Sequence, residues 1–189
     1  MALDTCQQRE GGIEPEIAGK FSFALYFRVL MGILSSPRRF FSGLPDSGAM
    51  APAMGCLLVS SLFYACAAFT QPHEQPLLTA AILFLNAVGM CFISAFLGFA
   101  AMIMTLGKRV AFPRFFSVYA FSSSVTLLAA WIPLFLWITE PWKWVLIAVG
   151  LVKCCALRWF QAIIVMGISI FVMVLFFWSI GPVIGYFKG

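Results

Sequence analysis

Five long apolar runs leave this chain few ways to fold in water. They cover about residues 50–70, 77–106, 115–139, 142–157 and 159–187, and they hold almost no charged residue. Of the 189 residues, 62% are hydrophobic and 10% are charged, whereas a soluble domain is about half apolar and about a quarter charged. A single core of this size could not bury so much apolar surface. The composition therefore excludes a soluble enzyme domain, a disordered chain and a nucleic-acid-binding module, and it indicates lipid as the main solvent.

The lengths of the five runs decide which of them can cross a membrane. A helix rises about 1.5 Å per residue and the hydrocarbon layer is about 30 Å thick, so a span needs about 20 residues. The fourth run is short, and it spans only if Lys143 and Lys153 extend toward the head groups; a half-inserted segment is the alternative. Glu140-Pro141 predicts a turn before this run, and Pro133 predicts a kink in the third. We therefore expect an all-α fold, a polytopic membrane helical bundle of about five transmembrane helices.

The segment before the first span, residues 20–46, predicts an amphipathic helix at the cytoplasmic interface. Polar residues recur there at helical spacing, namely Arg28, Gly32, Ser35 and Arg39. An Arg at the bilayer centre costs about 2.5–3.5 kcal/mol, which argues against a span here. The segment therefore lies in the interface or, as the alternative, packs on the bundle.

The dipeptide Ser36-Pro37 predicts a break within this segment. Proline restricts the residue before it and suits the first turn of a new helix, with Ser36 as the N-cap. We expect the pair Arg38-Arg39 at head-group level and the pair Phe40-Phe41 in the acyl boundary.

The distribution of basic residues predicts the orientation. The formal net charge is +5. We expect residues 1–19 to form a flexible cytoplasmic tail and residues 47–189 to form the transmembrane domain. With five spans, ten of the twelve Lys and Arg residues then lie on the cytoplasmic side. These are Arg9, Lys20, Arg28, Arg38, Arg39, Lys108, Arg109, Arg114, Lys153 and Arg158. Such a bias follows the positive-inside rule, so we expect a cytoplasmic N-terminus and an external C-terminus.

The sequence offers no set of residues suited to catalysis, a cofactor or a metal. The single histidine, His73, stands beside Glu74 in a predicted external loop, whereas zinc takes three or four ligands. The first, second, third and fifth runs hold no charge at depth, which argues against a proton-coupled pump. The six cysteines form no C-x-x-C pair and are expected to be reduced and buried; a thiol enzyme using Cys154 and Cys155 is a distant alternative. We expect no enzyme, no cofactor and no metal.

Small and polar residues inside the runs predict close helix packing. Residues expected to pack between helices are Asn86, Ala87, Cys91, Ala95, Gly98, Gly181 and Gly185. Hydroxyl side chains add to these, at Ser94, Ser122, Ser123, Ser124 and Thr126. Packing within the bundle is the first interpretation. A polar pocket for a lipid head group, or a face for a partner's helix, is the alternative.

Basic residues near the cytoplasmic side predict contact with anionic lipid head groups. The candidates are Arg28, Arg38, Arg39, Lys108, Arg109 and Arg114. Each basic residue at an anionic surface contributes about 1 kcal/mol.

Three segments and the span count resemble the Yip-domain (Ypt-interacting protein) family, in its bacterial branch. The segments are FRVLMGILSSPRRFFSGL, GKRVAFPRFFSVYAFSSSV and PWKWVLIAVGLVKCCALRWFQA, and the resemblance covers about residues 25–187. It implies a five-span integral membrane adaptor that shapes membranes or joins complexes, here in a bacterial cytoplasmic membrane. The D-L-Y-G-P motif of eukaryotic members is absent from this sequence, so their traffic and small-GTPase role is not carried over.

The function expected from these observations is that of a non-catalytic integral membrane subunit or scaffold. It would assemble with other membrane proteins, contact membrane lipids and bind no nucleic acid. The alternative is a lipid-binding or transport component of a membrane complex.

Overall fold

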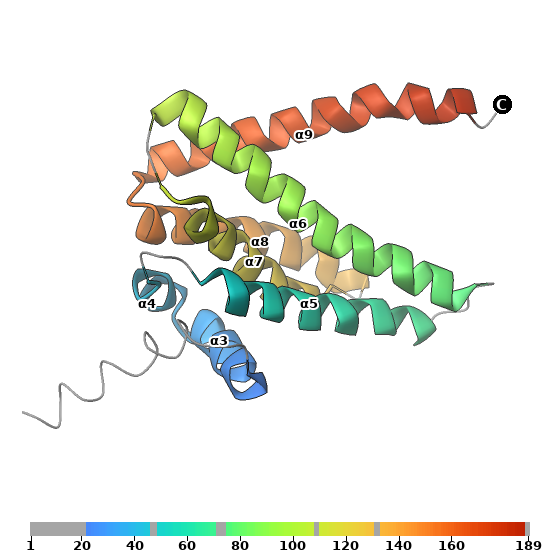
Figure 1. Ribbon diagram of the computed structural model, residues 1–189, viewed down its shortest axis with the longest axis horizontal. Coiled ribbons are helices and arrows are strands. Elements are labelled where there is room, and N and C mark those ends of the chain that lie inside the picture. The colour runs from blue at the N-terminus through green and yellow to red at the C-terminus, as the bar shows by residue number, and fades with distance from the viewer. Residues whose placement is uncertain (1–21, 46–48, 71–74, 108–109, 131–132, 188–189) are drawn as a thin grey trace, which may run out of the picture.

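The computed structural model describes residues 22–45, 49–70, 75–107, 110–130 and 133–187, and within these ranges the side chains of residues 68, 70, 133–137 and 175–187 are left aside. Every element in the described ranges is helical (Figure 1). The elements are α3 (Phe23–Ser35), α4 (Pro37–Ser42), α5 (Met50–Cys66), a 3-10 turn η1 (Ala67–Thr70), α6 (Pro76–Leu106), α7 (Phe112–Leu127), α8 (Pro133–Cys154) and α9 (Trp159–Phe187).

Helix α7 lies at the centre of the bundle and packs against α3, α5, α6 and α8. Its residues are buried almost without interruption from Phe115 to Thr126. Three of its hydroxyl side chains bond carbonyls of their own helix: Ser117 donates to Pro113 O at 2.7 Å, Ser124 to Phe121 O at 2.9 Å and Thr126 to Ser122 O at 3.2 Å. Helices α6 and α9 lie on one side of this centre, and α3 and α4 on the other (Figure 1).

Prolines mark the starts of several helices. A proline lies in the first turn of α4, α6 and α7, and α8 begins at Pro133, where the missing N–H leaves no intrahelical bond unmade. The predicted break at Ser36-Pro37 is confirmed, although the Ser36 side chain makes no cap hydrogen bond. Helix α6 ends at Gly107, whose φ of 60° is the left-handed conformation that glycine adopts without strain.

The predicted turn at Glu140-Pro141 is wrong. Helix α7 ends at Leu127, and α8 runs from Pro133 to Cys154 without a break at Pro141. The reason is that Pro133 starts a helix instead of kinking one, so the third and fourth runs divide about ten residues earlier than expected. The predicted short run thereby becomes a helix of 22 residues, which is long enough to cross a bilayer.

The segment before the first predicted span packs on the bundle with one face and exposes the other. Helix α3 buries Val29 and Ile33 among other residues, while Phe27 and Met31 are 64% and 68% exposed. The hydroxyls of Tyr26 and Ser60 are 2.9 Å apart and join α3 to α5. Burial raises the pKa of Tyr26, so this hydroxyl keeps its proton at neutral pH.

The expectation that Phe40 and Phe41 enter the acyl boundary is wrong. They are 4% and 0% exposed. The two rings meet edge to face with centroids 5.4 Å apart, and Phe40 meets Phe121 of α7 in the same way, also at 5.4 Å. Phe41 lies beside Gly150 of α8, where the absence of a side chain leaves room for its ring. Helix α4 is therefore part of the protein core.

Within the described residues, one helix, α6, is both long and apolar enough to cross a membrane by length and hydropathy. Shorter apolar helices are Phe23–Ser35, Met50–Cys66 and the stretch Trp159–Val174 of α9. The number of five spans therefore stays a prediction.

Candidate functional site

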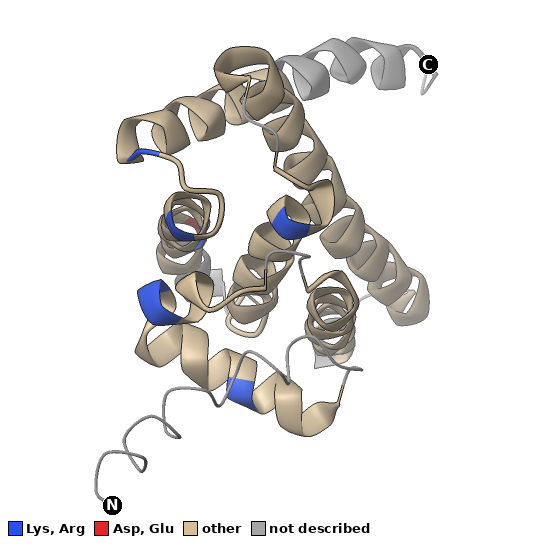
Figure 2. Cartoon of the chain, turned by 60° about the vertical axis from the view of Figure 1, so that its left-hand side comes forward, with Lys and Arg blue, Asp and Glu red and all other residues tan. Residues whose placement is uncertain are grey.

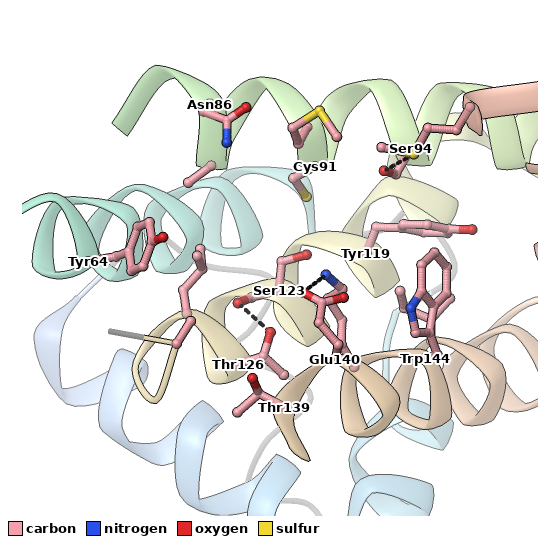
Figure 3. A pocket seen from close by; sticks show the side chains of 17 residues that line it. Tyr64, Asn86, Cys91, Ser94, Tyr119, Ser123, Thr126, Thr139, Glu140 and Trp144 are labelled. Carbon is pink, nitrogen blue, oxygen red and sulfur yellow. Dashed lines mark hydrogen bonds and ion pairs between the residues drawn. The ribbon is translucent and has the colours of Figure 1, made fainter. Parts of the chain in front are cut away.

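A cavity of about 340 Å³ lies among α5, α6, α7, α8 and α9 (Figure 3). Its walls carry apolar side chains such as Met90, Leu127 and Ile147. Polar side chains from separate helices also reach it: Asn86, Ser94, Ser123, Thr126, Glu140 and Lys143. A largely apolar cavity with a few convergent polar groups has the general character of a ligand site.

The charged part of the cavity is an ion pair on α8. Lys143 Nζ donates to Glu140 Oε1 at 2.7 Å, one turn away along the helix. The side chains of Lys143 and Glu140 are 24% and 50% exposed, so the pair borders both the cavity and its surroundings. The ammonium also lies 5.8 Å from the centroid of the Trp144 ring, within the range of a cation–π contact. Glu140 is the single acidic residue in the ranges that the structure describes.

A buried tyrosine contributes a hydroxyl without a hydrogen-bond partner. Tyr119 is 1% exposed and lines the cavity from α7, and its hydroxyl meets no partner among the described residues. The ring stacks on Phe115 with centroids 5.2 Å apart. Its far end lies against Gly98 of α6, where an added Cβ would come within 2.6 Å of the hydroxyl oxygen. A buried hydroxyl without a partner is unfavourable. The oxygen is closed off from the cavity space, so Tyr119 contributes its ring and not its hydroxyl to the cavity wall.

The small residues predicted to pack between helices lie on the inner face of α6. Cys91, Ala95 and Gly98 are buried there, and Ala87 is half-buried at the cavity wall. Asn86 is exposed and lines the cavity from α6 (Figure 3). Gly181 and Gly185 fall in the part of α9 whose side-chain surroundings are outside the description.

Basic residues gather at one end of the bundle, which faces the viewer in Figure 2. The segments that meet there carry Arg38, Arg39, Arg114, Lys153 and Arg158.

The predicted head-group residues have different surroundings. Arg28, Arg38 and Arg39 are exposed, whereas Arg114 is half-buried and its Nε donates to Cys154 Sγ at 3.2 Å. Lys108 and Arg109 are outside the described residues.

Groups that could act chemically at other places are few in the described ranges. No group of three His, Cys, Asp or Glu side chains that could hold a metal ion occurs there. Cys154 and Cys155 are 2% and 3% exposed, whereas a reactive thiol must be accessible. His73 is outside the described residues.

Sequence reasoning singled out Asn86, Ser94 and the hydroxyl cluster but did not find the charged part of the site. The sequence places Glu140 in a predicted turn and Lys143 at the edge of the fourth run. The three-residue spacing of an acid and a base is typical of one helix face, and that signal would have suggested a helix through Pro141. Nothing in the sequence pointed to Tyr119 as a cavity residue.

Comparison with known proteins gives one match. The family model of the Yip1 domain matches residues 31–180, which is more than half of the chain. No curated protein and no solved structure matches.

Proposed function

The chain belongs to the Yip1 domain family, a family of membrane proteins, and from that premise we propose that it is a non-catalytic membrane subunit that holds partner membrane proteins together. The proposal includes five spans, a bacterial cytoplasmic membrane, a cytoplasmic N-terminus and an external C-terminus.

The observation that supports this proposal most is the outer face of α6. Only 17% of the most apolar stretch of this 31-residue helix is buried. Large apolar side chains stand on the exposed face, among them Ile82, Leu85 and Phe96 at 57%, 68% and 62% exposure. Because the small residues of α6 face inward, partners would meet this outer face, where packing against another helix supplies van der Waals contact.

A photo-crosslinking residue at position 96 tests the scaffold proposal in cells. Phe96 is on the outer face, so we expect adducts with other membrane proteins, identified by mass spectrometry. The matched control is position 99, because Phe99 is also an aromatic residue of α6 but packs on Phe112 and Phe115 of α7, and it should give few such adducts. A C-terminal tag used for the purification should also be accessible to antibody on intact spheroplasts.

A chain that yields no protein adduct at position 96 and purifies alone and monodisperse would contradict the scaffold proposal. A tag accessible only after lysis would contradict the external C-terminus and, with it, the five-span arrangement.

The second candidate function is contact with anionic lipid through α3 and α4. Arg28, Arg38 and Arg39 are exposed, and the exposed apolar side chains of Phe27 and Met31 lie on α3. A surface that combines basic and large apolar groups is suited to an anionic membrane face.

Replacing both Arg38 and Arg39 with alanine should lower the amount of phosphatidylglycerol that the purified chain retains in mixed micelles. Two basic residues at about 1 kcal/mol each correspond to roughly 30-fold in affinity at low salt. The double Lys variant keeps both charges and should retain most of the binding. Equal phosphatidylglycerol binding by the alanine variant and the unaltered chain would reject this candidate.

A further inference from the structure

We propose that the cavity among α5 to α9 binds the head group of a zwitterionic phospholipid, with its ammonium at Glu140 and its phosphate at Lys143. This site is distinct from the basic surface of α3 and α4. The inference does not depend on the scaffold role, but it rests on α8 being one of the proposed membrane spans.

The ion pair is the first reason. An exposed Glu–Lys pair one turn apart on a helix stabilises that helix by only about 0.2–0.5 kcal/mol. This stabilisation is too small to explain why two charged side chains stand in a proposed membrane helix. Ionisable residues in membrane helices usually mark a site that uses them. In this bundle the pair borders a cavity that is large enough for a head group.

The charge balance selects the class of ligand. A purely anionic ligand would leave Glu140 facing it, and a purely cationic ligand would leave Lys143 facing it. A zwitterion can meet both, because its cationic part pairs with Glu140 Oε1 while its phosphate accepts from Lys143 Nζ. The Trp144 ring beside Lys143 favours keeping a cation at this position.

The remaining walls fit the rest of a phospholipid. The ring of Tyr119, stacked on Phe115, adds an aromatic wall. Asn86 offers an amide at the cavity wall. Met90, Leu127 and Met173 form apolar wall, which suits a glycerol backbone and acyl chains but gives little to a free, fully hydrated head group.

The test measures which lipid stays on the purified full chain. The full chain with Arg38 and Arg39 replaced by alanine, which removes the proposed anionic-lipid surface, is equilibrated in micelles that contain equal amounts of phosphatidylethanolamine and phosphatidylglycerol, and retained lipid is counted by native mass spectrometry. We expect phosphatidylethanolamine to be preferred, and Lys143→Gln or Glu140→Gln to reduce its retention about tenfold, the loss of one hydrogen bond to a charged group. The matched control is Lys153→Gln, an exposed lysine in the last turn of the same helix, which should have no effect.

Two further variants separate binding from folding. The double variant E140Q/K143Q removes both charges at two positions that are not buried, so it should keep the melting temperature of the unaltered chain and still lose the lipid. Tyr119→Phe removes only a hydroxyl that is closed off from the cavity, so it should keep both the fold and the lipid.

Three results would overturn the inference. They are equal retention of the two lipids, equal effects of Lys143→Gln and Lys153→Gln, and full retention by the double variant. Displacement of the lipid by an equal concentration of free phosphoethanolamine would overturn the assignment to a phospholipid.

Discussion

Replacing Phe41 with alanine should lower the free energy of unfolding by about 3 kcal/mol, the lower end of the range for a buried phenylalanine. Phe41 is 0% exposed, and its ring meets Phe40 and the backbone of α8 at Gly150. Removing the ring leaves a cavity between α4 and α8. We expect the lower end because lipid or detergent, and not water, surrounds the ring when the helices separate. The variant therefore loses mainly van der Waals packing and little hydrophobic transfer free energy.

The measurement is unfolding in mixed micelles, with Phe27→Ala as the control. Phe27 has the same side chain on the neighbouring helix but is 64% exposed, so its removal should change the stability little. If the two variants were equally stable, α4 would not be part of the core, and the earlier expectation that its rings enter the lipid would be restored.

Gly150→Ala should destabilise the bundle by about 1–3 kcal/mol, the usual range for overpacking a core. An alanine within a helix is ordinarily more stable than a glycine by about 0.5–1 kcal/mol, so the sign of the effect is informative. At Gly150 an added Cβ would collide with Cγ1 of Val118 on α7 and would come within 3.4 Å of the Phe41 ring. Gly167→Ala is the control, because nothing lies within 4 Å of a Cβ added there, and it should stabilise the protein.

The double variant V118A/G150A tests the cause of that effect. Val118→Ala removes the methyl group that an alanine at position 150 would meet, so the double variant should be more stable than the sum of the two single effects. Additive effects in thermal or denaturant unfolding would show that Val118 is not the obstacle. A stabilising Gly150→Ala would show that α7 and α8 are not in close contact here.

The sequence predicted the features that depend on residues close to one another in the chain, namely the bounds of long apolar helices and a break at a proline. The predicted second and fifth runs, 77–106 and 159–187, agree with α6 and α9 to within one residue at each end. The break at Ser36-Pro37 was also predictable, because proline limits both itself and the residue before it. In each case the signal lies within a few residues of the feature.

Other features depend on neighbours that the sequence does not display. Pro133 and Pro141 both predict a disturbance, but only the surrounding bundle decides which one starts a helix and which one lies inside it. Likewise, apolar periodicity cannot tell a side chain that faces lipid from one that faces protein, and this is why Phe40 and Phe41 were misplaced.

The candidate site was predictable only in its separate parts. Asn86, Ser94, Ser123 and Thr126 stand out in the sequence as polar residues in apolar runs. Their convergence on one cavity with Glu140 and Lys143 depends on how far each helix is rotated about its axis, and no local pattern fixes that rotation between helices separated by tens of residues.

The hydrogen bond between Tyr26 and Ser60 bears on the order in which the helices find one another during biosynthesis. The most extensive helix contact of the bundle joins α5 to α7, yet all of α6 leaves the ribosome between them. Helix α3 is made before α5, so Tyr26 is available to Ser60 as soon as α5 emerges. Helix α3 can therefore supply a hydrogen-bond partner to Ser60 of the nascent α5 before α7 has been synthesised and packs against α5.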